Sequence, residues 1–211
     1  MFARTILIAA AAVGVGAGSV ASCSKPVPPI KQVGQAPDSF RVNFETTRGS
    51  FVVQVNRDWA PHGADRFYAL VENQFFDGDP FFRVVPGFIA QFGLNLTRKV
   101  NEQWDEPRIP DDSVKQSNLR GTMTFASEGP NSRNHQLFFN LADKNARLDR
   151  TGFAPIGKVV SGMEVVDSLN GEYGDTPEQH FINTMGKGYL DRMFPKLDYI
   201  KTVRVAPADA K

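Results

Sequence analysis

The sequence contains few residues that could form disulfides, bind metals or give the protein a large net charge. A single cysteine among 211 residues excludes a disulfide within the chain and a disulfide-stabilised fold. The 24 lysines and arginines nearly balance the 23 aspartates and glutamates, so a net charge of +1 gives no electrostatic basis for nucleic-acid binding. The three histidines, His62, His135 and His180, lack the spacing of metal ligands, and we expect neither metal nor cofactor. His135 is expected in a surface loop, with contact to a functional site as the alternative.

The sequence also lacks an apolar run long enough for a comfortable membrane span. Residues 6–20 are apolar and uncharged, but a transmembrane helix needs about 20 such residues. Arg4 precedes this run and small residues follow it, so residues 1–22 are interpreted as a signal peptide. The ending Val20-Ala21-Ser22-Cys23 resembles the lipobox of bacterial lipoproteins, which predicts a lipidated Cys23. Plain secretion and an uncleaved anchor remain the alternatives.

A polar, proline-rich stretch follows the single cysteine. It contains Pro26, Pro28, Pro29 and Pro37 without hydrophobic periodicity, which is typical of a linker. The expected organisation is a signal peptide over 1–22, a tether over 23–37, one folded domain over 38–206 and a tail over 207–211. We therefore expect an exported protein, periplasmic or otherwise extracytoplasmic, that is held at the membrane only through a lipid on Cys23.

The folded region is rich in phenylalanine and in short apolar stretches. There are 17 phenylalanines against 4 tyrosines and 2 tryptophans, which indicates an aromatic core. Alternation of apolar and polar residues at Phe40, Val42 and Phe44 predicts a strand with one buried face. Similar stretches predict strands over residues 40–44, 51–55, 81–85, 89–93, 121–126, 136–141, 154–160 and 199–205.

Two helices are predicted between these strands. One opens at Pro61 and places Ala64, Phe67 and Leu70 on one face, and the other covers residues 163–169. Residues 170–195 form a long, glycine-punctuated connection, in which residues 176–178 could cap a short helix. Many short strands with two separate helices favour a mostly β fold, an antiparallel barrel with helices at its openings.

Residues 81–93 are the most informative segment of the sequence. They read Phe-Phe-Arg-Val-Val-Pro-Gly-Phe-Ile-Ala-Gln-Phe-Gly. Alternation places Phe81, Arg83 and Val85 on one face of a strand, so a single arginine is flanked by large apolar side chains. Such an arginine either packs its stem while its head reaches water, which is common, or stands at the rim of an apolar pocket.

This segment resembles the signature of the cyclophilin family, Phe-x-Arg-aliphatic-aliphatic-Pro-Gly-Phe followed by Gln and Gly. Further blocks agree in order and spacing, namely residues 120–126, 129–132, 136–139, 148–159, 162–167 and 194–200. The region from about 40 to 205 is therefore identified as similar to the cyclophilins. The resemblance implies a closed eight-stranded antiparallel β-barrel capped by two α-helices, peptidyl-prolyl cis/trans isomerase activity without a covalent intermediate, and a monomer.

The resemblance also implies roles for individual residues. Arg83 would be the cation placed against the prolyl nitrogen, and Gln91 would hydrogen-bond the substrate backbone and help to hold Arg83. The residues implied to bind the substrate are Phe88, Ile89, Ala126, Ser127, Gln136, Phe138, Leu148 and Phe153. The implied partners are proline-containing segments of unfolded or folding proteins.

The sequence departs from the pattern of many eukaryotic cyclophilins at four positions of this site. Arg147 stands where those proteins carry Trp, Phe153 where they carry His, Ile89 where Met is usual and Ser127 where Asn is usual. We still expect isomerase activity, because the cation, the pocket phenylalanines and Gln91 are present. The alternative is a non-catalytic proline-peptide-binding or chaperone module on the same fold. The presence of Arg83 favours the enzyme, because binding alone does not need a cation at the nitrogen.

Overall fold

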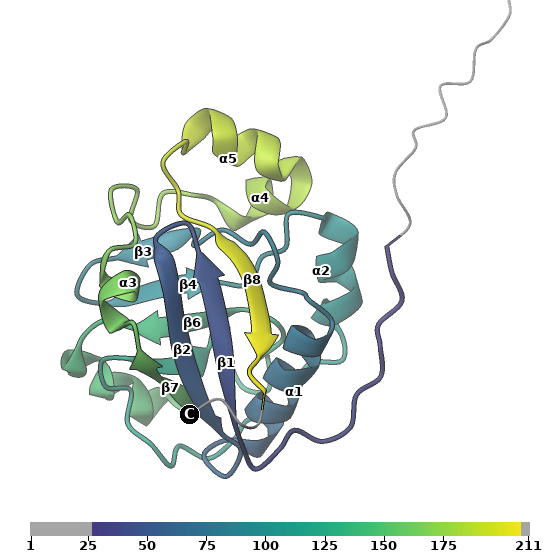
Figure 1. Ribbon diagram of the computed structural model, residues 1–211, viewed down its shortest axis with the longest axis vertical. Helices are drawn as coiled ribbons and strands as arrows, with labels where there is room; N and C mark the ends of the chain where they lie inside the picture. The colour runs from purple at the N-terminus through teal and green to yellow at the C-terminus, as the bar shows by residue number, and fades with distance from the viewer. Residues whose placement is uncertain (1–26, 208–211) are drawn as a thin grey trace, which may run out of the picture.

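One antiparallel sheet of eight strands forms the centre of the computed structural model, which describes residues 27–207 (Figure 1). The strands are β1 (Ser39–Thr46), β2 (Gly49–Asn56), β3 (Arg83–Val85), β4 (Ile89–Phe92), β5 (Thr122–Phe125), β6 (Leu137–Asn140), β7 (Pro155–Ser161) and β8 (Ile200–Val205). Their order across the sheet is β3-β4-β6-β5-β7-β2-β1-β8. The prediction of a mostly β fold with eight antiparallel strands is therefore confirmed.

The prediction of a closed barrel is wrong, because the sheet curls without pairing its two edge strands. The segment ahead of β3 meets the start of β8 through an isolated bridge of Pro80 with Tyr199. Backbone hydrogen bonds flank this bridge, from the Phe81 N–H to the Asp198 carbonyl at 2.9 Å and from the Ile200 N–H to the Asp79 carbonyl at 2.8 Å, but β3 and β8 themselves form no ladder. Proline has no N–H with which to continue a ladder, and β3 is only three residues long. The backbone N–H of Val84 in β3 instead donates to the Gly174 carbonyl at 3.1 Å. The connecting segment 170–195 thus occupies the edge that a closed barrel would pair.

The prediction of two helices is also incomplete. The described residues contain α1 (Pro61–Glu72), α2 (Arg98–Asp105), α3 (Met163–Asp167), α4 (Gln179–Met185), α5 (Lys187–Met193) and the 3₁₀ helix η1 (Asp143–Thr151). Apolar periodicity predicted α1 and α3, and the possible cap at residues 176–178 predicted a short helix that α4 confirms, because its N-cap is Glu178. The eight-residue α2 buries just Asn101 and Trp104, and α4 and α5 have seven residues each, so none shows a long apolar stripe. Within residues 27–207 no helix has the length and apolar character to cross a membrane.

Phenylalanine rings fill the main core, which lies inside the curled sheet under α1. Phe92 of β4 and Phe139 of β6 stack with ring centroids 5.3 Å apart, and Phe44 of β1 meets both rings edge to face. Such pairs contribute about 0.5–1.5 kcal/mol each beyond the burial of their area. Because side chains alternate along a strand, the neighbours of Phe92 and Phe139 face the outer side of the sheet. The aromatic core therefore fixes which residues of β4 and β6 are available for a site.

A second, smaller core joins the 170–195 segment to the sheet. It consists of Phe82, Leu94, Ile182, Leu190, Phe194 and Leu197. Gly186, between α4 and α5, has φ +57°, and a Cβ there would lie 2.9 Å from the carbonyl oxygen of Leu96. Glycine at this position lets the two short helices turn closely over the loop after β4. The segment packs as part of the domain, at the top of the view in Figure 1.

Residues 27–37, which the sequence assigns to the tether, follow the surface of the domain past α2 and α1 (Figure 1). The backbone N–H of Lys31 donates to the Asn73 side chain at 2.6 Å, and Asn73 donates back to the Lys31 carbonyl at 3.0 Å. Ile30 packs against the main core, and Gln103 of α2 donates to the Pro28 carbonyl at 3.3 Å. Residues 28–31 therefore pack against the folded domain, about eight residues before β1 begins at Ser39. Cys23 lies outside the described residues.

Asp79 is a fully buried carboxyl at the seam between the two sheet edges. It is 0% exposed, and neither carboxyl oxygen has a hydrogen-bond partner within residues 27–207. Burial raises the pKa of Asp79 well above its usual range, and the nearby charge of Asp77 raises it further. The protonated form is therefore the one that the folded protein stabilises.

We predict that Asp79→Asn changes how stability depends on pH. In the unfolded chain the carboxyl loses its proton near pH 4, whereas the folded protein retains it to higher pH. Above pH 4 the unfolded state binds fewer protons, so the free energy of unfolding of the unmodified protein falls as pH rises towards the folded pKa. Urea unfolding from pH 4 to 9 should show Asp79→Asn gaining stability relative to the unmodified protein as pH rises. Asp58→Asn, at an exposed carboxylate, is the matched control, and a constant difference between the Asp79 variant and the unmodified protein would refute the prediction.

Candidate active site

A single groove of about 410 Å³ on the outer side of the sheet brings together every residue to which the sequence assigns a catalytic or substrate-binding role. These residues are Arg83, Phe88, Ile89, Gln91, Ala126, Ser127, Gln136, Phe138, Leu148 and Phe153. They come from β3, β4, β6, η1 and the connecting loops, including the loop after β5. The groove is therefore built from segments that lie far apart in the sequence. The structure thus places the residues together, while their individual roles remain predictions.

The groove is organised around a row of three side chains on neighbouring strands. Arg83 of β3 lies opposite Gln91 of β4, which lies opposite Phe138 of β6. Residues directly opposite one another in a sheet share a face, so the register alone sets the guanidinium, the amide and the ring side by side. Phe81 does not share this face, because the regular strand begins only at Arg83 and the Phe81 ring lies in the main core.

The guanidinium of Arg83 is held by one polar and one aromatic neighbour. Its Nη1 donates to Oε1 of Gln91 at 3.3 Å, and its Cζ lies 5.8 Å from the centre of the Phe88 ring. Arg83 is half-buried, whereas Gln91 is only 6% exposed. Arg147 approaches the same ring, with its Cζ 5.3 Å from the centroid. The Phe88 ring therefore contacts two cations, of which Arg83 alone lines the groove.

The apolar part of the groove lies beyond Arg83. Ile89 and Phe138 are 3% and 4% exposed, and the rings of Phe138 and Phe153 meet edge to face with centroids 5.9 Å apart. Leu148 of η1 closes the far side. These side chains surround a volume that suits a small ring, because they offer dispersion contacts and exclude water.

Ala126 and Ser127 form a polar rim at the end of β5. The Ala126 N–H donates to the Gln136 carbonyl at 2.9 Å, which ties this rim to the strand that carries Phe138. The Ser127 hydroxyl donates to the Gly129 carbonyl at 2.6 Å and lies 2.9 Å from the Ser132 hydroxyl. The side chain of Ser127 therefore stabilises its own loop, and the backbone is what this rim presents to the groove.

Seven further residues line the groove that the sequence did not assign to it. They are Asp105, Arg108, Glu128, Ser132, Asn134, Gln179 and Asn183. Most are polar residues of loops or of the short helices α2 and α4, and only their placement in three dimensions distinguishes them from ordinary surface residues. The sequence contained one indication of these additional groove residues, namely the unusual length of the 170–195 connection, which contributes Gln179 and Asn183.

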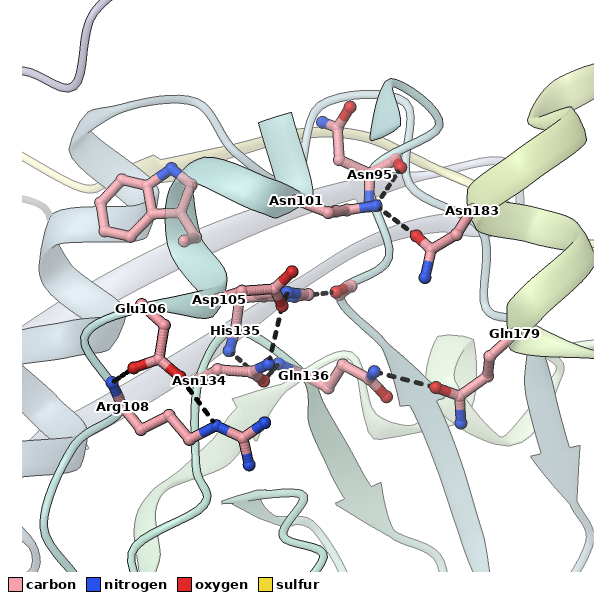
Figure 2. A network of polar contacts seen from close by, with 12 residues as sticks. Asn95, Asn101, Asp105, Glu106, Arg108, Asn134, His135, Gln136, Gln179 and Asn183 are labelled. Atoms are coloured by element: carbon pink, nitrogen blue, oxygen red, sulfur yellow. Dashed lines mark hydrogen bonds and ion pairs between the residues drawn. The ribbon is translucent and has the colours of Figure 1, made fainter. Parts of the chain in front are cut away.

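His135 is buried, contrary to the surface loop that the sequence favoured, and it does not line the groove. Its Nδ1 lies 2.7 Å from the Gly93 carbonyl oxygen, which can only accept, so this nitrogen carries the proton. Burial lowers the pKa of the imidazole, against smaller opposing effects of Gly93 and Asp105. The ring is therefore neutral near pH 7. Its Nε2 lies 3.1 Å from Oδ1 of Asp105 and can donate to that oxygen only when the imidazole becomes the doubly protonated cation. His135 supports the wall behind the groove (Figure 2).

Acidic side chains near the groove do not form a metal site. Asp105 accepts from Asn134, and Glu106 pairs with Arg108 at 3.4 Å. Within residues 27–207 no three histidine, cysteine, aspartate or glutamate side chains lie close enough together to hold a metal ion.

Comparison with known proteins gives a consistent family. The family model described as cyclophilin type peptidyl-prolyl cis-trans isomerase matches residues 41–187. A peptidyl-prolyl cis-trans isomerase of Acinetobacter baylyi is 35% identical over 61% of this chain and 70% of its own length. A probable peptidyl-prolyl cis-trans isomerase of Brucella abortus is 31% identical over 80% of this chain and 85% of its own length.

Solved structures show the same fold. The crystal structure of a cyclophilin type peptidyl-prolyl cis-trans isomerase of Cryptosporidium parvum covers 80% of this chain and 98% of its own, with a TM-score of 0.59 and 19% sequence identity. That protein has also been crystallised in the presence of the dipeptide Ala-Pro, in a structure that gives a TM-score of 0.58 here.

We predict that shortening the Phe138 side chain weakens binding of a proline-containing peptide. Phe138→Leu removes part of the apolar surface that faces the groove, and the lost contact corresponds to about tenfold weaker binding. Titration of a fluorescent Ala-Pro peptide measures this affinity, with thermal unfolding to confirm that the variant is folded. Phe181→Leu, at a partly exposed ring of α4 outside the groove, is the matched control. Equal affinity of the Phe138 variant and the control would show that this ring does not bind the peptide.

Proposed function

Because the chain belongs to the cyclophilin-type peptidyl-prolyl cis-trans isomerases, we propose that its groove is where prolyl peptide bonds turn and that Arg83 acts on the turning bond. The family defines the activity: the protein accelerates rotation about X-Pro bonds in other proteins and so assists their folding. The residues that perform this step are the part that we propose.

The chemistry of the step requires no nucleophile. Rotation about a prolyl amide has a barrier of about 18–20 kcal/mol, because the nitrogen shares its lone pair with the carbonyl group. In the twisted transition state the nitrogen regains this lone pair and can accept a hydrogen bond. A fixed cationic donor aimed at that nitrogen stabilises the transition state more than the planar substrate, which is the condition for catalysis.

The single observation that carries the proposal is the position of Arg83 at the rim of the apolar slot. Its guanidinium, fixed by Gln91 and the Phe88 ring, borders the same cavity as Phe138, Leu148 and Phe153. A proline ring among these apolar side chains would have its nitrogen near the guanidinium. Exclusion of water from the slot also favours the twisted amide, which is less dipolar than the planar one. A module that only bound proline would need the slot and not the cation.

We predict that Arg83→Ala lowers kcat/KM by about 10²–10³, the usual loss when one preorganised donor is removed from a transition state. Folding should persist, because the side chain is half-buried and makes no ion pair within the described residues. A protease-coupled assay with a proline peptide measures the rate. Arg147→Ala is the matched control, because it removes the other guanidinium from the Phe88 ring and should change the rate only a few-fold. An unchanged rate in Arg83→Ala would end the catalytic role of this residue.

We further propose that the protein acts outside the cytoplasm as a monomer, anchored through a lipid on Cys23. The support is the sequence: a positive residue, a short apolar run and the ending Val20-Ala21-Ser22-Cys23. Pro28, whose carbonyl accepts a hydrogen bond from Gln103 of α2, lies five residues after Cys23. Five extended residues span at most ~18 Å, so the anchor would hold the domain close to the membrane surface.

We predict that the mature protein begins at Cys23 and carries acyl chains on it. Mass spectrometry of the amino-terminal peptide measures both features directly. Cys23→Ser should move the protein from the membrane fraction to the soluble fraction, whereas Ser24→Ala, a neighbouring change that keeps the cysteine, should not. An unmodified cysteine in the mature protein would favour plain secretion instead.

A further inference from the structure

A chain of three side-chain hydrogen bonds connects Arg83 to helix α4. Arg83 donates to Gln91 at 3.3 Å, Nε2 of Gln91 donates to Oε1 of Gln136 at 3.0 Å, and Nε2 of Gln136 donates to Oε1 of Gln179 at 2.9 Å. Figure 2 shows the last link, with Gln136 and Gln179 pointing toward each other. Both residues line the groove. The chain begins at the residue proposed to act on the substrate and ends in the 170–195 segment.

The direction of this chain is fixed by chemistry. A guanidinium carries only donors, so Gln91 must accept with its oxygen and is left to donate with its nitrogen. Gln136 in turn accepts from Gln91 with its oxygen, so its nitrogen is the atom that donates onward. Gln179 supplies the acceptor for that nitrogen. Each amide therefore holds a single orientation, and a residue at position 179 continues the chain only if it offers an oxygen.

Helix α4, which carries Gln179, is itself fixed on both sides. Asn101 of α2 donates to Oδ1 of Asn183 at 2.7 Å, as Figure 2 shows. Ile182, fully buried, belongs to the small core that contains Phe82, the residue immediately before Arg83. The same segment bonds the edge of β3 through Val84 and Gly174. Segment 170–195 thus contacts β3 in three ways. It bonds the backbone of β3 at Val84, it packs against Phe82, and it reaches the guanidinium of Arg83 through the side chains of Gln136 and Gln91.

We propose that Gln179 is a positioning residue for Arg83, and that the 170–195 segment thereby forms part of the catalytic apparatus. This inference rests on the proposed role of Arg83. An arginine has many rotamers, and a preorganised site gains rate by holding one of them before the substrate arrives. Gln179 is exposed and its bond is neutral, so its effect on the rate is modest, about three- to tenfold.

Three variants of α4 test the proposal. Gln179→Met keeps the length and helix propensity of the side chain but removes the acceptor. Gln179→Glu keeps an acceptor oxygen. Thr184→Val removes a hydroxyl of the same helix whose only bond in the described region is to the His180 carbonyl. We expect Gln179→Met to lower kcat and kcat/KM three- to tenfold with KM unchanged, and the other two variants to stay within twofold of the unmodified enzyme. This pattern marks an interaction made in the transition state.

A second measurement separates positioning from a general structural effect. If Gln179 acts through Arg83, adding Gln179→Met to Arg83→Ala should cause no further loss of kcat/KM. The proposal is overturned if Gln179→Met alone is fully active, if Gln179→Glu loses as much as Gln179→Met, or if the loss persists undiminished without Arg83. If Arg83→Ala is itself fully active, the proposed catalytic role of Arg83 fails first. If Arg83→Ala is impaired while Gln179→Met is not, only the inference about Gln179 fails.

Discussion

The arrangement of the groove depends on the register among three neighbouring strands, β3, β4 and β6. Arg83 lies directly opposite Gln91, and the next strand places Phe138 opposite Gln91. A shift of one residue would turn every one of these side chains to the other face of the sheet. The pairing of the strands therefore places the charged head, the amide that orients it and the ring that borders the slot side by side on one face.

The aromatic core secures this register. Ile89 and Gln91 face the groove while their neighbour Phe92 faces inward, and Phe138 faces the groove while Phe139 stacks on Phe92. Displacing either strand would expose these inward rings to water and cost several kcal/mol of buried apolar contact. The abundance of phenylalanine thus bears on function, because the rings that stabilise the domain also hold the groove side chains in place.

The seam of the sheet links the fold to the site in a second way. β3 is short and has Pro80 just ahead of it, so its outer edge cannot form a regular ladder with β8. The 170–195 segment bonds to that edge and buries its own apolar residues against Phe82. An edge strand that carries a functional residue would otherwise be free to fray. The segment limits that freedom and also brings two polar side chains, Gln179 and Asn183, to the groove wall.

The sequence by itself determined the elements whose signals are local. Alternation located the first strand, and short apolar stretches between glycine, proline and asparagine located the later ones. Apolar spacing located α1 and α3, and one contiguous motif located Arg83, Phe88 and Gln91. Together with the later motif blocks it also determined the family, because several ordered matches do not arise by chance. These features depend on neighbours within a few residues, which is the range over which side-chain periodicity carries information.

Only the tertiary structure decided the features that depend on distant partners. The open seam follows from a bond between Val84 and Gly174, and the burial of His135 follows from its contacts with Gly93 and Asp105. The polar helix α2 has no apolar stripe to reveal it, and α4 was indicated only by a possible cap at residues 176–178. The two helices are held together by side-chain bonds such as that between Asn101 and Asn183. Such contacts join residues far apart in the chain. Their free energy exists only once the sheet has brought those residues together, so no local pattern records them.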